Sequence, residues 1–294
     1  MHFHGPIVRP PTDAYSLFIE LTVGCTHNSC TFCNFYDGYP FHVAPLEQIE
    51  ADLREAKARF PHAEKIWASG GNPYALSTKK LEAIGQLFQK YFPKAEVSMY
   101  ARVDDLMRKS VEDMRKLKAL GFSNILVGIE TGDDETLKHV NKGYTAAEIL
   151  EGCQRLEAAG VKYRVIYLGA IAGKGKTVQA AKNTVAIFNQ LHPYLMYLTT
   201  VSVLPGTKLY EERKQGKFIE PSEKERLEEF ITLLGGLKND MHVYAAPNTT
   251  RFSFMIDLQK EKGEVIDRMR EIQQQLTEED EERMQAYRDA MVSV

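Results

Sequence analysis

Apolar, β-prone segments alternate with amphipathic segments along most of the chain, at a fairly steady pitch. Short apolar runs bounded by turn residues predict strands, and longer runs with a helical period predict helices. The predicted strands are 16–23, 65–69, 96–102, 125–130, 162–169 and 195–203. The predicted helices are 46–59, 78–91, 110–120, 146–159 and 177–191. Such repeated alternation implies parallel strands with right-handed crossovers, so we expect an α/β fold, a partial and open (β/α)6 barrel.

Helix start and stop signals agree with this pattern. Thr145 followed by Glu148 is a capping box, and Ser110 stands before two acidic residues at another predicted helix start. Gly121 and Gly160 lie where helix C-caps belong.

The chain divides into three predicted parts. Residues 1–13 form an N-terminal arm, residues 14–204 form the barrel, and residues 205–294 form a C-terminal extension that covers it. The strongly charged stretch 278–288 predicts a solvated surface helix.

Composition narrows the class of protein. The 294 residues are 44% hydrophobic and 26% charged, which is ordinary for a globular protein. A net charge of −3 gives no electrostatic reason to expect bulk nucleic-acid binding. No secretory signal or membrane-length apolar run is visible, so we expect a cytoplasmic protein with no membrane association.

Three of the four cysteines follow the first predicted strand in one window: Cys25, Cys30 and Cys33, spaced C-x4-C-x2-C. A closed zinc site needs a fourth Cys or His, and His27 in the first spacer is the nearby candidate. Three unligated core cysteines are the plainer alternative. A [4Fe–4S] cluster held by three thiolates instead keeps one iron open for an outside ligand, which at a strand's carboxyl end is a catalytic arrangement.

This loop resembles the cluster-binding loop of the radical S-adenosylmethionine (SAM) enzymes, spaced C-x3-C-x2-C with an aromatic residue before the last cysteine. Phe32 holds that aromatic position, and the first spacer here is longer by a single residue. The resemblance implies that the amino and carboxylate groups of SAM chelate the open iron. One electron then cleaves the sulfonium and releases a 5′-deoxyadenosyl radical that abstracts hydrogen from a substrate.

Glycines after the second predicted strand extend the resemblance. Gly70, Gly71 and Asn72 let the backbone approach a ligand closely and offer N–H and C=O groups to an ammonium or a carboxylate. The position resembles the family's glycine-rich motif that holds the methionine amino group, with Asn72 in place of the usual acid. Taken alone, these residues would also suit an ordinary turn.

Two arginines are further candidates for cofactor binding. Arg102, at the end of the third predicted strand, would bind the SAM carboxylate through its guanidinium or form a surface salt bridge with Asp104 or Asp105. Arg164, on the fifth predicted strand, is a further predicted contact to the cofactor.

The fourth predicted strand ends at Glu130, and its continuation resembles the branch of oxygen-independent coproporphyrinogen oxidases and Elongator-like proteins. In that branch a polar residue at this strand end binds the ribose hydroxyls, and a basic residue twelve positions later reaches the carboxylate. Glu130 and Lys142 match these positions, with Glu for the more usual Gln and Lys for Arg. The branch also implies a substrate-region motif near residues 248–250 (Asn-Thr-Thr).

Two other features carry rival hypotheses. The sequence Gly175-Lys176-Thr177 after a strand is typical of a phosphate loop, although Ala170 stands where that pattern needs glycine. Cys153, mid-helix, is expected to be a buried free cysteine; alone, it cannot hold a second cysteine-ligated cluster.

The sequence thus predicts an oxygen-sensitive radical SAM enzyme that holds a [4Fe–4S] cluster and SAM and receives electrons from a flavodoxin or ferredoxin. Its substrate is not identifiable from the sequence. The alternative is a non-catalytic iron–sulfur or zinc cysteine-loop sensor or binding protein on an α/β scaffold.

Overall fold

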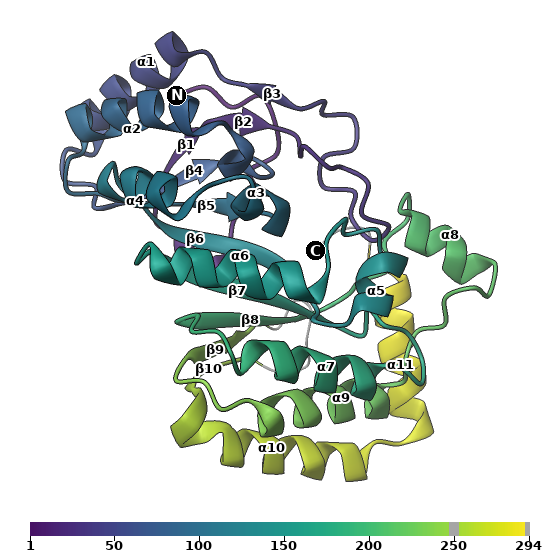
Figure 1. The fold of residues 1–294 in the computed structure, drawn as a ribbon. Helices are drawn as coiled ribbons and strands as arrows, with labels where there is room; N and C mark the ends of the chain where they lie inside the picture. The colour runs from purple at the N-terminus through teal and green to yellow at the C-terminus, as the bar shows by residue number, and fades with distance from the viewer. Residues whose placement is uncertain (247–252, 292–294) are drawn as a thin grey trace. The chain divides into compact units, whose positions relative to one another are not determined.

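The structure is a computed structural model that describes residues 1–246 and 253–291 (Figure 1). The predicted substrate-region motif at 248–250 lies outside the described residues. The chain forms two compact units. Unit 1 comprises Met1–Asn28, Phe35–Gly128 and Glu151–Arg164, and unit 2 comprises Ser29–Asn34, Ile129–Leu150 and Val165–Val294.

The strands mostly follow the apolar runs of the sequence. They are β1 (Leu17–Glu20), β2 (Thr22–Val23), β3 (His42–Val43), β4 (Lys65–Ser69), β5 (Glu96–Ala101), β6 (Phe122–Glu130), β7 (Lys162–Gly169), β8 (Leu195–Thr200), β9 (His242–Ala245) and β10 (Phe254–Asp257). The six predicted strands include neither β9, which pairs in parallel with β8, nor β10, which pairs with β9.

The sheet is open and mostly parallel. Its strands hydrogen-bond in the order β1-β4-β5-β6-β7-β8-β9-β10, with parallel pairing between β1 and β4, β4 and β5, β5 and β6, and β8 and β9. β10 runs antiparallel to β9, and β2 pairs separately with β3. Within the described residues the order does not return to β1, so the predicted α/β class with an open barrel is confirmed.

In unit 1, short apolar-faced helices pack beside the strands. The helical elements are η1 (Pro11–Asp13), α1 (Leu46–Arg59), η2 (Pro73–Ala75), α2 (Thr78–Tyr91), α3 (Val103–Met107) and α4 (Val111–Ala119). α2 lies between α1 and α4 (Figure 1). Phe88 of α2 meets Phe122 of β6 edge to face, with ring centroids 5.8 Å apart, which fixes the helix on the sheet.

Unit 2 contains most of the C-terminal helices. They are α5 (Asp134–His139), α7 (Thr177–Phe188), α8 (Lys208–Lys214), α9 (Glu223–Gly236), α10 (Leu258–Gln275) and α11 (Glu278–Asp289), while α6 (Ala146–Ala158) contributes to both units. α9 packs between α7 and α10 (Figure 1). No helix in residues 1–246 and 253–291 combines the length and hydropathy that a membrane crossing requires.

The predicted helix caps are confirmed. The Glu148 N–H donates to Thr145 Oγ1 at 3.3 Å, and the Thr145 N–H donates to the Glu148 carboxylate at 2.8 Å. After α6, Gly160 has φ +68°, and the Val161 N–H closes the helix end on Leu156 O at 2.9 Å. Three strand predictions are wrong in detail: segment 16–23 splits at Leu21 into β1 and β2, β6 begins at Phe122 and not at residue 125, and β8 ends at Thr200 and not at residue 203.

Candidate functional site

The first cysteine of the loop follows β2 and is held against the end of β4. The Gly71 N–H donates to Gly24 O at 3.1 Å. A Cβ added to Gly71 would lie 2.4 Å from that oxygen and 2.9 Å from Cys25 Cα, and one added to Gly70 would lie 2.0 Å from Thr22 Oγ1. Only glycine therefore permits the close approach between the end of β4 and the segment that carries Cys25.

Asn72 grips the residue after Cys25. Its side chain is fully buried; Oδ1 accepts from the Thr26 N–H at 3.0 Å, and Nδ2 donates to Thr26 Oγ1 at 2.7 Å. The second Nδ2 proton goes to Asp105 Oδ2 at 2.9 Å. One amide proton of Asn72 thus holds the loop and the other is bonded to Asp105, contacts that the sequence did not reveal.

Arg102 lies at the N-cap of α3, directly after β5. Its side chain is largely buried and its Nε donates to Asp104 Oδ1 at 2.9 Å, the salt bridge that the sequence left open. The backbone N–H of Arg102 donates to Asp105 Oδ2 at 2.9 Å. Burial raises the pKa of the Asp105 carboxyl. Binding of a cofactor carboxylate by Arg102 stays a prediction.

The second half of the cysteine loop, Ser29–Asn34, belongs to unit 2 and is held there mainly by backbone bonds. The Thr31 N–H donates to Val140 O at 3.1 Å, and Thr31 O accepts from the Leu209 N–H at 2.7 Å. Asn141, with φ +55°, donates its side-chain amide to Ser29 O at 2.9 Å. These anchors come from distant segments, so no local pattern could have predicted them.

Three predicted site residues of unit 2 meet at the end of β6. Lys142 Nζ lies 3.0 Å from Glu130 Oε1, and both side chains are about nine-tenths buried or more. The same ammonium lies 5.8 Å from the centroid of the Phe32 ring and 5.4 Å from that of Tyr144. Glu130 adopts φ +67°, an uncommon backbone for a non-glycine residue. The sequence analysis predicted Glu130 and Lys142 as separate binding residues, and the structure shows them as an ion pair.

Phe32 also packs into an apolar cluster of unit 2. The cluster contains Val140, Ala170, Ile171, Val201, Val203, Leu209 and Phe218. It joins the aromatic residue of the cysteine loop to the ends of β7 and β8, so burial of this ring adds to the backbone anchors of the loop.

Glu229 of α9 is a buried residue that the sequence analysis missed. It accepts hydrogen bonds from Tyr167 Oη at 2.7 Å and from the Ala170 N–H at 2.7 Å. Ala170 has φ +65°, so the carboxylate fixes a strained turn at the end of β7. Burial raises the pKa of Glu229 to about 7. The sequence contains one signal of this burial: Glu229 lies four positions before Leu233, so an acidic residue falls on the buried face of the helix.

Arg164 lies away from these groups, near the amino end of β7. Its guanidinium pairs with Asp13 and donates to Thr12 Oγ1 at 3.1 Å, over the ring of Trp67. These contacts hold Thr12 and Asp13 against β7 within unit 1. The predicted cofactor role of Arg164 stays untested by this arrangement.

The phosphate-loop alternative does not fit its surroundings. The Gly175 N–H already donates to the Glu225 carboxylate at 2.8 Å, and Lys176 pairs with Glu135 at the surface. A cavity of about 300 Å³ beside Gly175 is lined by Lys224, Glu225 and Glu228 among others. The Glu225 carboxylate that accepts from the Gly175 N–H holds the place where a phosphate would bind and would repel it.

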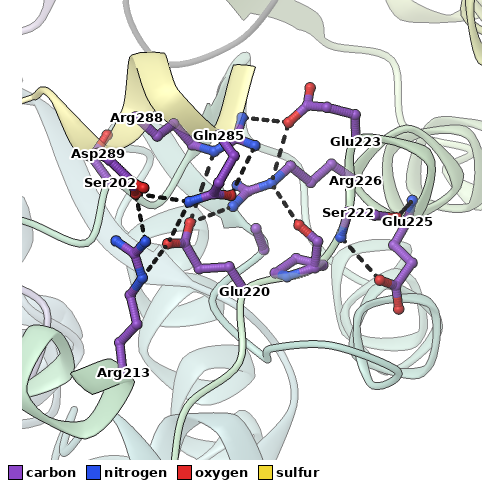
Figure 2. A network of polar contacts seen from close by, with 12 residues as sticks. Ser202, Arg213, Glu220, Ser222, Glu223, Glu225, Arg226, Gln285, Arg288 and Asp289 are labelled. Carbon is purple, nitrogen blue, oxygen red and sulfur yellow. Dashed lines mark hydrogen bonds and ion pairs between the residues drawn. The ribbon is translucent and has the colours of Figure 1, made fainter. Parts of the chain in front are cut away.

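A network of charged side chains holds α11 against the other elements of unit 2 (Figure 2). Glu220 accepts from Arg226 at 2.8 Å and from Arg213 at 3.1 Å, and Arg288 of α11 pairs with Glu223. α11 is the predicted charged helix, and none of its described side chains is fully buried. Its position is therefore set by ion pairs and not by an apolar core.

The cysteines suit an iron–sulfur cluster by their donor chemistry. Cys25, Cys30 and Cys33 form no disulfide and are partly exposed on one loop. Cys153 is fully buried, as predicted, and burial raises the pKa of its thiol. Cys25 belongs to unit 1, and Cys30 and Cys33 belong to unit 2. Soft thiolates in this number are typical ligands of a cluster with an open iron.

Two solved structures share the fold. Coproporphyrinogen III oxidase (HemN) from Escherichia coli has a TM-score of 0.55 at 18% identity, over 75% of this chain and 51% of that one. The radical SAM methyltransferase TsrM from Kitasatospora setae, with cobalamin and a [4Fe–4S] cluster bound, has a TM-score of 0.55 at 15% identity, over 68% of this chain and 37% of that one.

The sequence also matches curated relatives and one family model. The heme chaperone HemW of Bacillus subtilis is 22% identical over 238 residues, which are 76% of this chain and 60% of the relative. The chain therefore spans about 60% of the length of the curated relatives it matches. The family model, described as the Radical SAM superfamily, matches residues 19–186, which include the cysteine loop and the ends of β4, β5 and β6. Because this match covers more than half of the chain, the protein belongs to the radical SAM superfamily.

Proposed function

We propose that the protein is an enzyme that reductively cleaves SAM and uses the resulting 5′-deoxyadenosyl radical to abstract hydrogen from a substrate. Its cofactors are those of its superfamily, a [4Fe–4S] cluster and SAM. The observation that carries the proposal is the cysteine loop, since Cys25, Cys30 and Cys33 lie within the family match. Residues after β4 hold the loop in unit 1, and Val140 and Leu209 hold it in unit 2.

In unit 1 the proposed roles follow from the contacts around Cys25. Gly70 and Gly71 bring the end of β4 against the loop, and Asn72 fixes the residue after the cysteine. Arg102 offers its guanidinium to the SAM carboxylate, and the ion pair with Asp104 holds the side chain in place until it does so.

In unit 2 the proposed binding group is the Glu130–Lys142 pair. A carboxylate oxygen of Glu130 would accept from the ribose hydroxyls, and the Lys142 ammonium balances its buried charge. Lys142 would reach the SAM carboxylate, and Phe32 would shield the loop from water. Since Arg164 contacts Asp13 and Thr12, its observed neighbours favour an anchoring role for the N-terminal arm.

We further propose that the protein works in the cytoplasm and is sensitive to oxygen. Superfamily enzymes need an electron donor, and a flavodoxin or ferredoxin would supply the electron. The division into an arm (1–13), a barrel (14–204) and a covering extension (205–294) is part of this proposal; β9 and β10 fall within the last part.

A second candidate is a non-catalytic role. Two of the matched curated relatives are named heme chaperones, and in this role the protein would hold its cluster and bind heme without turnover of SAM. Heme added to the purified protein would then give a saturable change in the heme absorption spectrum.

The deciding experiment is anaerobic reconstitution with iron and sulfide, reduction with dithionite, and assay for 5′-deoxyadenosine. We expect product from the wild type and from Cys153→Ala, which removes a buried thiol, and none from Cys30→Ala. A reconstituted cluster of about four irons per chain without any product would reject the enzyme and favour the chaperone or sensor. Zinc in place of iron would reject both iron-based functions.

A further inference from the structure

Asp105 of unit 1 contacts two predicted site residues, Asn72 and Arg102, and through Asn72 it is connected to the segment that carries Cys25. One carboxylate oxygen, Oδ2, accepts from the Asn72 amide at 2.9 Å and from the Arg102 N–H at 2.9 Å. Asn72 in turn brackets Thr26, the neighbour of Cys25. We infer that Asp105 is a positioning residue that sets the cysteine loop through Asn72, an inference that rests on the proposed role of Cys25.

The burial of Asp105 distinguishes it from an ordinary helix cap. It occupies the N3 position of α3 and accepts from the N–H of the N-cap residue Arg102, as the Asp113 carboxylate does from the Ser110 N–H in the capping box at the start of α4. The box of Ser110 and Asp113 is exposed, whereas Asp105 is fully buried. Its second oxygen, Oδ1, has no hydrogen-bond partner. A buried carboxylate that is only half satisfied is costly, and capping alone would not require it.

The carboxylate fixes the orientation of the Asn72 amide. Because Asp105 Oδ2 accepts hydrogen bonds only, it must face Nδ2 and not Oδ1 of Asn72. Oδ1 is thereby directed to the Thr26 N–H, and the remaining Nδ2 proton is directed to Thr26 Oγ1. Without this carboxylate only the Thr26 N–H sets the orientation of the amide, because the Thr26 hydroxyl can both donate and accept, and Asn72 loses one of its three side-chain hydrogen bonds.

The inference also explains why position 72 carries an amide. An acid at this position would set two buried carboxylates 2.9 Å apart, and one of them would have to take up a proton. In this chain the carboxylate is on Asp105, and Asn72 connects it to the loop by hydrogen bonds to both Asp105 and Thr26.

The test uses three variants of the full chain in metal-free form. Asp105→Ala removes the carboxylate, Asp105→Asn keeps an oxygen for both bonds, and Asp113→Ala removes the matched exposed capping box. Hydrogen exchange of the peptide covering residues 22–28 is the first readout. We expect exchange in this peptide to accelerate about tenfold in Asp105→Ala, and to match the wild type in the other two variants.

Equal exchange in Asp105→Ala and the wild type would overturn the inference, as would the same acceleration in Asp113→Ala. If Asp105→Ala fails to fold, Thr26→Val takes its place, since it removes only the exposed hydroxyl that Asn72 contacts. A several-fold acceleration is then expected, and none would count against the inference.

A second readout separates this inference from the proposed function. In reconstituted protein, addition of SAM should change the electron paramagnetic resonance spectrum of the reduced cluster in the wild type and Asp105→Asn, and less in Asp105→Ala. Absence of any cluster in the wild type would reject the proposed function, while the exchange data on the metal-free chain would still decide the role of Asp105.

Discussion

Glu229 should make the stability of the fold depend on pH. Its ordinary pKa is 4.5, and burial raises the value in the folded protein to about 7. The Arg226 charge and the two hydrogen bonds act in the opposite direction without offsetting burial. A raised folded pKa means that the folded state binds this proton more tightly than the unfolded state. The contribution is therefore full below the unfolded pKa and is lost as pH rises through about 7.

The size of this stability change follows from the difference between the unfolded and the folded pKa of Glu229. As the pH rises from 4.5 to about 7, the wild type loses about 1.4 kcal/mol of unfolding free energy per pH unit from Glu229 alone, which is about 3 kcal/mol in total. Glu229→Gln removes the titration, while its amide can still accept from the Ala170 N–H and donate to Tyr167 Oη. Relative to the wild type, the variant should gain about 3 kcal/mol of unfolding free energy between about pH 4.5 and pH 8.

The assay is urea denaturation followed by circular dichroism at closely spaced pH values. Groups common to both proteins cancel in the difference between the variant and the wild type. Glu228→Gln, a change at the exposed neighbouring position, is the matched control and should give a flat difference. Parallel stability curves for Glu229→Gln and the wild type would refute the argument that burial controls this carboxyl.

Two further predictions concern the loop and the buried ion pair. In urea denaturation, Gly71→Ala should destabilise the protein by about 2 kcal/mol or more, because the added methyl group meets Gly24 O. Gly263→Ala, in open space on α10, is the control and should be neutral or slightly stabilising. Glu130→Gln or Lys142→Met alone should cost about 3 kcal/mol, and the double variant clearly less than the sum; strictly additive losses would show that the two groups do not interact.

Local signals explain the elements that the sequence predicted well. Both β4 and β7 have the bounds expected from their apolar runs, since their residues are buried on most positions and charged residues begin each run. The capping box of Thr145 and Glu148 likewise needs only residues three positions apart. Information of this kind is contained within a few neighbouring residues.

Non-local pairing explains the errors. Segment 16–23 looked like one strand, but the Leu21 N–H bonds to Ser69 O and Leu21 O accepts from the Ala44 N–H, so the chain changes partner there. No pattern within the segment marks that change. The strand β9 is only four residues long and depends on β8 for its place in the sheet.

In the candidate site, too, the features that depend on local spacing were predictable and those that depend on distant partners were not. The cysteines were recognisable because their spacing is local, as was the strand-end position of Glu130. The pairing of Glu130 with Lys142 was not, since it depends on how α5 returns the chain. Asp105 lies on a helix of five residues that no periodicity could reveal.

The way the cysteine loop is anchored bears on how its length can vary. On one side Gly24 and Thr26 are held by Gly71 and Asn72, and on the other Thr31 is held through its backbone within unit 2. Most of these bonds use main-chain groups, which any residue supplies. An insertion between the two anchored stretches displaces neither, and Asn28, with φ +40°, lies in that interval. A lengthened first spacer is thus a change that such a loop can accept while keeping its anchors, so spacing alone is a poor criterion for excluding distant members of the superfamily.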